Sequence, residues 1–123
     1  MPTDFTVSLF HRPGTLAAAS AALGQAGINI EGACAFVCGE TGVYHLLVSD
    51  AERARRALLD AGFDILAERR VVLHPVEHRP GAAAALLARI ADLGISVDLL
   101  YLSADSQLVI GGDDPEGIRR ALG

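Results

Sequence analysis

The sequence predicts an α+β protein that contains two copies of one βαββαβ unit. Two observations carry this prediction. The tetrapeptide HRPG occurs at residues 11–14 and again at residues 78–81, each time before an Ala-rich stretch. Around each copy, apolar residues alternate as in a strand and then recur with the spacing of an amphipathic helix. Hydrophobic residues make up 51% of the chain and charged residues 20%, so there is enough apolar side chain for a packed core.

A shift of 67 residues, from residue 11 to residue 78, aligns more than the tetrapeptide. GINIE at 27–31 then falls on GISVD at 94–98. Further along the chain the offset shrinks by three or four residues. The aligned pairs there are HLLVSD (45–50) with LVIGGD (108–113) and RRAL (55–58) with RRAL (119–122). Because hairpin loops tolerate changes in length, we place the lost residues in a hairpin.

The first copy provides a signal for each of its elements. Pro13 and Gly14 suit a turn from a strand into a helix, whose apolar face holds Leu16, Ala19, Leu23 and Ala26. Two further glycines end the helices, and an aspartate caps the second. The expected elements are strand 5–10, turn 11–14, helix 15–26, strand 28–38, hairpin turn 39–42, strand 43–49, a helix from Asp50 through Ala61, and strand 63–69. Two helices on one face of an antiparallel four-stranded sheet bury both apolar stripes.

The second copy runs out of residues before a fourth strand. Its expected elements are strand 71–76, helix 81–93, strand 95–103, a shorter strand 107–111 and a final helix that starts at Asp114 and Pro115. We therefore expect two domains, 1–70 and a C-terminally short 71–123. Strand 71–76 should have an open edge, and Pro75 fits this because proline is tolerated at sheet edges.

Charge and hydropathy exclude several classes of protein. The net charge is -5, and the ten basic residues are all arginines that lie mostly on expected helices beside acids, so a nucleic-acid partner is not expected. No apolar run reaches the roughly 20 residues that span a bilayer, so no membrane partner is expected either. The N-terminus lacks the pattern of a signal peptide, and we expect a cytoplasmic protein.

Two cysteines, Cys34 and Cys38, fit a reducing compartment. On one extended strand they lie about 13 Å apart, too far for a disulfide. We expect buried or half-buried free thiols without histidine neighbours, which make a poor metal site.

Residues 8–31, SLFHRPGTLAAASAALGQAGINIE, resemble the ACT domain, a small ferredoxin-like βαββαβ module that senses amino acids. The resemblance rests on an RPG turn followed at the right distance by GINI, and it covers both halves of the chain. It implies a free-standing tandem ACT protein with regulatory, allosteric function and with no enzyme attached. The family usually has Asp or Asn before RPG, whereas both copies here have His.

The resemblance also implies a ligand site where the RPG loop of one ACT unit meets the start of the second strand of another. An amino acid would lie there, in a homodimer or higher homo-oligomer. The implied site residues are His11, Arg12, Pro13, Gly14, Thr15, Leu16, Ile28 and Asn29 in the first copy and His78, Gly81 and Ser96 in the second.

The chemistry of these residues suits a zwitterion. A helix N-terminus after Gly14 offers unpaired N–H groups to a carboxylate, and Gly14 removes a side chain where the ligand comes close. The carbonyl oxygen of Asn29 can accept from an ammonium group, and His11 can donate from a ring nitrogen. Each residue also has a purely structural interpretation: HRPG as a sturdy turn, the histidines and Asn29 as exposed polar groups, and Arg12 and Arg79 as surface charges or partners of nearby acids.

No pattern in the chain indicates an enzyme. It has no nucleophile motif, metalloprotease helix or phosphate loop, and Tyr44 and His45 fall on opposite faces of a strand. We therefore expect no catalytic residues, no metal and no cofactor, although His74 and His78 could form a metal pair. Two alternatives to an amino-acid sensor stay open. One is an oligomerisation module without a ligand, and the other is a small metal-handling or metabolite-transforming protein of the same topology.

Overall fold

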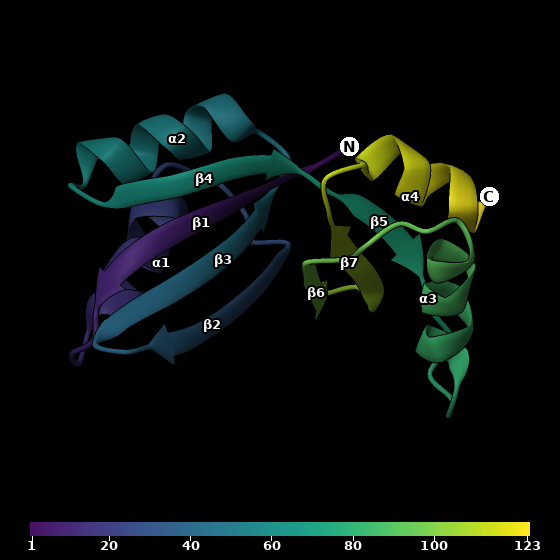
Figure 1. Ribbon diagram of the computed structural model, residues 1–123. Helices are drawn as coiled ribbons and strands as arrows, with labels where there is room; N and C mark the ends of the chain where they lie inside the picture. The colour runs from purple at the N-terminus through teal and green to yellow at the C-terminus, as the bar shows by residue number, and fades with distance from the viewer. The chain divides into compact units, whose positions relative to one another are not determined.

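A computed structural model describes all residues, 1–123. The chain divides into two compact units, one of residues 2–69 and one of residues 70–123 together with Met1. Each unit pairs an antiparallel sheet with two helices (Figure 1). The α+β class of the fold, with two ferredoxin-like units, is confirmed.

The first unit contains all six predicted elements. They are β1 (Thr3–Phe10), α1 (Thr15–Gln25), β2 (Gly32–Cys38), β3 (Thr41–Val48), α2 (Ala51–Asp60) and β4 (Asp64–Arg70). The strand order is β2-β3-β1-β4, so β1 lies inside the sheet and β2 and β4 form its edges. In the β1–β3 ladder Thr3 is opposite Val48 and Phe10 is opposite Thr41.

The second unit repeats this plan with one strand fewer. Its elements are β5 (Val72–Pro75), α3 (Ala82–Asp92), β6 (Leu99–Leu102), β7 (Gln107–Gly111) and α4 (Pro115–Leu122). The strand order is β5-β7-β6. The prediction that this unit lacks a fourth strand is confirmed, and β5 lies at an edge of its sheet.

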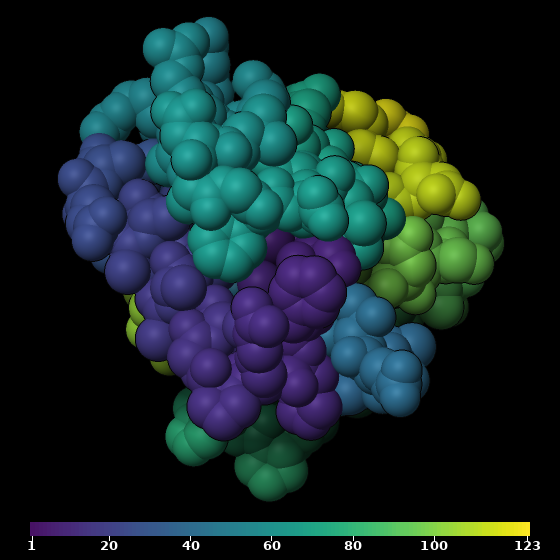
Figure 2. Space-filling view, turned by 90° about the vertical axis from the view of Figure 1, so that its left-hand side faces the viewer, coloured from purple at the N-terminus to yellow at the C-terminus, as the bar shows by residue number.

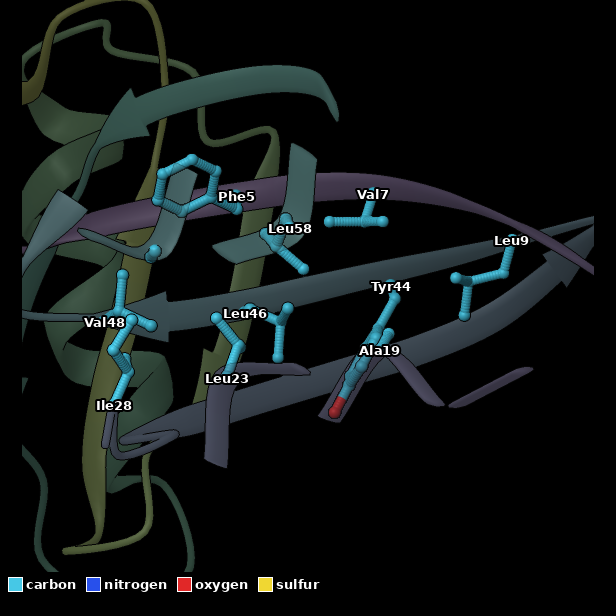
Figure 3. Packing of buried hydrophobic residues seen from close by; sticks show 11 residues of the cluster. Phe5, Val7, Leu9, Ala19, Leu23, Ile28, Tyr44, Leu46, Val48 and Leu58 are labelled. Carbon is cyan, nitrogen blue, oxygen red and sulfur yellow. The ribbon is translucent and has the colours of Figure 1, made fainter. Parts of the chain in front are cut away.

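Alternate residues of the strands build the core of the first unit (Figure 3). Phe5, Val7 and Leu9 of β1 point to the side of the helices, where Ala19 and Leu23 of α1 meet them. Tyr44, Leu46 and Val48 of β3, together with Ile28, Ala54 and Leu58, complete the cluster. The period of two along each strand therefore decides which residues face the helices.

A smaller core of the same kind holds the second unit together. Its buried members are Val72, Ile90, Leu108, Ile110, Ile118 and Leu122. Two of them come from α4, which begins at an N-cap that the sequence predicts: the Asp114 side chain accepts a hydrogen bond from Gly117 N at 2.9 Å. Asp50 caps α2 in the same way, through Arg53 N at 3.1 Å.

Two predicted strands begin later than expected. The strand predicted at 28–38 starts at Gly32, and the strand predicted at 95–103 starts at Leu99. In both places a glycine with positive φ ends the helix, and the next residue turns back to it: Ile28 N donates to Leu23 O, and Ile95 N donates to Ile90 O. The following residues form a connection from helix to sheet, with a ladder bond only from Glu31 N or Asp98 N.

The alignment of the two copies after the hairpin also needs a correction. The helix caps Asp50 and Asp114 are equivalent and lie 64 residues apart, as do the two RRAL segments. Strand pairing agrees, because Gly32 is opposite Leu47 and Leu99 is opposite Gly111. Residues 45–50 therefore correspond to 109–114, one residue later than predicted.

The helices are short: α1 and α3 have 11 residues each, and no helix is long and apolar enough to cross a membrane.

Candidate functional site

The two HRPG segments form the same turn. Gly14 has φ 91° and ψ -10°, and Gly81 has φ 85° and ψ -10°. Both glycines are the N-caps of the following helices and adopt the left-handed conformation, which a residue with a Cβ reaches only at a cost. No protein atom lies within 4 Å of the position that a Cβ on either glycine would take, so backbone geometry rather than crowding requires glycine here.

The two turns share a backbone bond but differ in their side-chain contacts. Arg12 N donates to Phe10 O at 2.9 Å, and Arg79 N donates to Glu77 O at 3.0 Å. In the first turn the hydroxyl of Thr15 adds bonds to Phe10 O at 2.8 Å and to Arg12 O at 3.2 Å. The second turn has Ala82 in this position, so it lacks the side-chain to backbone bonds that close the first turn.

The start of α1 keeps free hydrogen-bond donors. No side chain caps this helix; Thr15 N donates to Arg12 O at 3.4 Å, and Ala18 N donates to Gly14 O at 2.9 Å. Leu16 N and Ala17 N have no acceptor within the protein. These two N–H groups and the positive end of the helix dipole suit an anionic group.

An apolar cavity of about 480 Å³ lies beside the first turn, on the side of β2. His11, Arg12, Gly14 and Leu16 line it, and Ala35, Phe36 and Val37 of β2 close its other side. We call it the β2-side cavity. Its size is in the range of small-molecule sites. Leu16 was predicted to join the core face of α1, but it is 47% exposed and lines this cavity instead.

The second turn has an equivalent cavity of about 560 Å³. His78, Arg79, Pro80 and Ala83 line it at the positions of His11, Arg12, Pro13 and Leu16. Its wall is more polar, because Glu77 replaces Phe10.

A separate cavity of about 480 Å³ lies on the other side of the first turn, where β4 begins. Ser8, Arg12, Glu40, Thr41, Phe63 and Asp64 are among the residues that line it. Figure 2 looks onto this end of the first unit, where purple residues around the turn lie beside the teal residues that join α2 to β4. We call it the β4-side cavity.

Comparison with protein families identifies the chain. The sequence model of a family described as "ACT domain pair" matches residues 2–122. The chain belongs to the ACT domain pair family. Each unit is thus one ACT unit, and the resemblance seen in the HRPG and GINI segments is confirmed.

Solved structures share the fold of the ACT pair at low sequence identity. Protein BT0572 from Bacteroides thetaiotaomicron is 23% identical, with a TM-score of 0.86, over 98% of this chain and 85% of that one. The ligand-free regulatory subunit of aspartate kinase from Thermus thermophilus is 18% identical, with a TM-score of 0.71, over 98% and 89%. A putative glycine cleavage system transcriptional repressor is 16% identical, with a TM-score of 0.50, over 89% and 76%. The comparison with curated protein sequences gave no match.

A single ACT unit does not bring all the predicted site residues together. His11, Arg12, Pro13, Gly14, Thr15 and Leu16 gather at the start of α1, around the β2-side cavity. Asn29 follows the other end of this helix, and 11 helical residues span about 16 Å. Asn29 is exposed, whereas Ile28 is buried in the core and its N–H donates to Leu23 O.

The second ACT unit divides its site residues in the same way. His78 and Gly81 lie at the start of α3, and the exposed Ser96 follows its end.

The arginines of the two turns have different partners. Arg79 forms an ion pair with Glu77, with Nε 2.6 Å from Oε2. The guanidinium carbon of Arg12 instead lies 5.1 Å from the ring centre of Phe10, at the position equivalent to Glu77. Both arginines are exposed, and only Arg79 has an acidic partner.

The sheet face away from the core carries a polar row that the sequence does not reveal. The His45 Nδ1 atom lies 2.9 Å from Asp4 Oδ2 and 3.3 Å from Thr6 Oγ1. Cys34 is opposite His45 in the β2–β3 ladder, so the expectation that the thiols have no histidine neighbour is wrong. The Phe36 ring stacks on His45 at 6.1 Å. Both cysteines are free thiols; Cys34 is half-buried as predicted, but Cys38 is exposed near the end of the edge strand β2. No three His, Cys, Asp or Glu side chains gather as a metal site would need.

Proposed function

We propose that this ACT pair is a non-catalytic regulatory protein that binds a free amino acid between ACT units. The observation that supports it best is the division of each unit's polar groups between the two ends of its first helix. The HRPG turn, two free N–H groups and an apolar cavity lie at one end, and Asn29 or Ser96 lies at the other. A second unit is needed to bring an Asn29-type end to an HRPG-type end.

Each group matches a part of an amino acid. The carboxylate binds at Leu16 N and Ala17 N, where the helix dipole also favours a negative charge. The amide oxygen of Asn29 accepts from the ammonium group. The apolar walls of the β2-side cavity receive the side chain, and His11 donates to the carboxylate from the edge of the site.

The first unit provides the groups that should bind an amino acid more tightly. It combines the Thr15 hydroxyl, which fixes the turn, with Asn29 and with an apolar cavity wall. The second unit has Ala82, Ser96 and the acidic Glu77 at the corresponding places. Because Glu77 occupies the guanidinium of Arg79, the second turn has no free arginine for a carboxylate ligand, so we place the higher affinity at sites that use the first turn.

The names of two structural neighbours support a regulatory role. One is a regulatory subunit of aspartate kinase and the other a putative transcriptional repressor of a glycine cleavage system. We also propose a cytoplasmic location, which the free thiols of Cys34 and Cys38 support.

A thermal-shift screen against the twenty amino acids tests the proposal. A ligand at a hundredfold excess over Kd stabilises the folded state by about 2.7 kcal/mol, which is a clear shift in Tm. For the amino acid found, Asn29→Ala should weaken binding about 10-fold or more, because it removes a polar partner of a charged group. Gly14→Val should weaken it too, by placing a side chain and strain at the ligand's approach.

Ser96→Ala is the matched control, since it changes the equivalent position of the second unit. We expect a smaller loss of affinity than for Asn29→Ala. Unchanged affinity in both Asn29→Ala and Gly14→Val would contradict the proposed site.

A second function, an oligomerisation module without a ligand, is favoured by exposed apolar side chains on both outer strands. Phe36 and Val37 of β2 are 50% and 48% exposed, and Leu100 and Leu102 of β6 are 43% and 58% exposed. Such residues on sheet edges favour pairing with another chain. A stable oligomer that none of the twenty amino acids stabilises would support this function over the first.

A further inference from the structure

The β4-side cavity is a second candidate site in the first ACT unit, and the proposed interface site does not explain it. It lies on the opposite side of the HRPG turn from the β2-side cavity. All its walls come from one unit, so it needs no second unit to be complete. The apolar residues Leu9 and Phe63 line it together with Ser8 and Thr41.

Only the first unit has this cavity, because Gly62, Phe63 and Asp64 at the start of β4 build one wall. The second unit has no strand equivalent to β4. The cavity next to its own turn corresponds to the β2-side cavity. The two repeats share the HRPG turn but differ in this cavity. The second unit therefore serves as a comparison for properties that depend on the turn alone.

Arg12 carries a positive charge that no acid of the protein neutralises. In the second repeat, the equivalent Arg79 is held by Glu77 at 2.6 Å. Phe10 replaces that glutamate in the first repeat and holds the guanidinium over its ring, 5.1 Å from the centre. A ring contact orients the guanidinium without cancelling its charge, so its N–H groups stay available for a carboxylate from outside the protein.

Two carboxylates share the cavity with Arg12. Glu40 comes from the β2–β3 hairpin and Asp64 from the first position of β4. Neither forms an ion pair with Arg12 or with any other basic group of the chain. The cavity therefore presents one cation and two anions, and its complement is a small molecule with one carboxylate and two cationic groups.

We infer that the β4-side cavity binds a dibasic amino acid, whose carboxylate pairs with Arg12 and whose two ammonium groups pair with Glu40 and Asp64. The methylene chain of such a molecule lies against Leu9 and Phe63. Arg12 lines both cavities, but Glu40 and Asp64 line only this one, so the two groups that select a dibasic ligand can be changed without altering the interface site.

Calorimetric titration of the full chain with L-lysine tests the inference. Two analogues each lack one recognised group: L-norleucine has no side-chain ammonium, and 1,5-diaminopentane has no carboxylate. Both should bind about 10-fold or more weakly than lysine. Glu40→Gln and Asp64→Asn should each lower the affinity for lysine by a similar factor, with unchanged Tm. Asp92→Asn, which makes the same change of charge on an exposed residue of the second unit, should leave it unaltered.

The outcomes separate this cavity from the interface site. Lysine binding that survives Asn29→Ala and is lost in Glu40→Gln and Asp64→Asn supports the inference. Lysine binding with the opposite dependence places the ligand at the interface; it overturns the inference and leaves the proposed function intact. Equal affinity for lysine and norleucine, or no lysine binding at millimolar concentration, also overturns it.

Discussion

The carboxylate of Asp4 lies 2.9 Å from Nδ1 of His45, across the ladder between β1 and β3. Asp4 is fully buried, although Phe5 beside it on the same strand points into the core on the opposite face. A buried carboxylate is costly unless it is hydrogen-bonded, and His45, which also contacts Thr6 Oγ1, is a polar partner of this one. The central strand of the first unit therefore depends on a polar contact as well as on apolar packing.

Replacement of His45 should destabilise the protein. His45→Ala leaves the buried Asp4 carboxylate without this partner, and we expect the free energy of unfolding to fall by about 1–3 kcal/mol. Thr6→Val should cost less, because its contact with His45 is longer, at 3.3 Å. Urea denaturation followed by circular dichroism measures both. A larger loss in Thr6→Val than in His45→Ala would show that the histidine is not the main partner.

The sequence predicts the order of the elements well, because each has a local signal. Alternation marks β1, glycines with positive φ mark the ends of the helices, and Asp50 and Asp114 mark the caps of α2 and α4. The starts of β2 and β6 were not predictable from these signals. The apolar residues at 28–30 and 95–97 look like strand residues, but part of that segment packs against the core while it crosses from helix to sheet.

The candidate sites also contain features that the sequence predicts and features that only the folded structure reveals. The HRPG turns and their free helix ends follow from the tetrapeptide itself, because proline and glycine fix the local backbone. The β4-side cavity joins Arg12, Glu40 and Asp64 from three distant parts of the chain, and only the tertiary fold brings them together. The pairing of Cys34 with His45 depends on strand register, which the sequence alone leaves open.

Two glycines within helices should respond oppositely to replacement by alanine. At Gly24 in α1 no atom lies within 4 Å of the added Cβ, so Gly24→Ala should stabilise the protein by about 0.5–1 kcal/mol through helix propensity. At Gly117 in α4 the Cβ would lie 2.8 Å from Ile95 Cδ1 and closer still to the Asp114 carboxylate. Gly117→Ala should therefore lower Tm, whereas Gly24→Ala should raise it. The same sign for both substitutions would contradict the packing seen around Gly117.

Substitutions at the equivalent positions Thr15 and Ala82 test whether a hydroxyl group stabilises the HRPG turn. Thr15→Val keeps the shape of the side chain but removes its hydrogen bonds to Phe10 O and Arg12 O, and it should cost about 0.5–1.5 kcal/mol. Ala82→Thr adds a hydroxyl at the equivalent place in the second turn, but Ala82 is buried, so we expect no matching gain. Thermal unfolding of both variants compares the effects. An unchanged Tm in Thr15→Val would mean that the backbone bonds alone hold the first turn.

The surface pair of Arg55 and Glu68 should make a small contribution to stability that depends on pH. The side-chain hydrogen bond from Arg55, at 2.6 and 2.7 Å, holds the pKa of the Glu68 carboxyl below its ordinary value, and the charge of Arg55 acts in the same direction. A carboxyl with a lowered pKa stabilises the folded state above the pKa of the unfolded chain, and this stabilisation is lost as pH falls through the folded value.

Glu68→Gln should therefore be less stable than the wild type at neutral pH, by about 0.5 kcal/mol as expected for an exposed pair. The difference should shrink in acid, below the ordinary carboxyl pKa of about 4.3. Urea denaturation at both pH values measures it. A difference that grows as pH falls would have the wrong sign for a lowered pKa.

The open edge of β5 predicts self-association. This strand pairs with β7 on one side, and its sheet has no strand on the other. Pro75, which cannot donate a ladder hydrogen bond, lies at the end of β5. An unpaired edge next to apolar side chains such as Leu73 is a template for another strand, so we propose at least a homodimer in which strand edges associate.

Light scattering after size-exclusion chromatography at high micromolar concentration measures the oligomer directly. Leu73→Lys places a charge on the β5 edge and should shift the protein toward monomer, because buried charges disfavour strand pairing. Leu93→Lys is the control. Leu93 is 60% exposed at the end of α3, so the substitution adds the same charge at a position outside β5. If the wild type is a monomer and the amides of residues 72–76 exchange slowly, the edge is protected within one chain and the prediction is wrong. If the two variants dissociate into monomers to the same extent, the dimer forms elsewhere, because only Leu73→Lys alters the edge of β5.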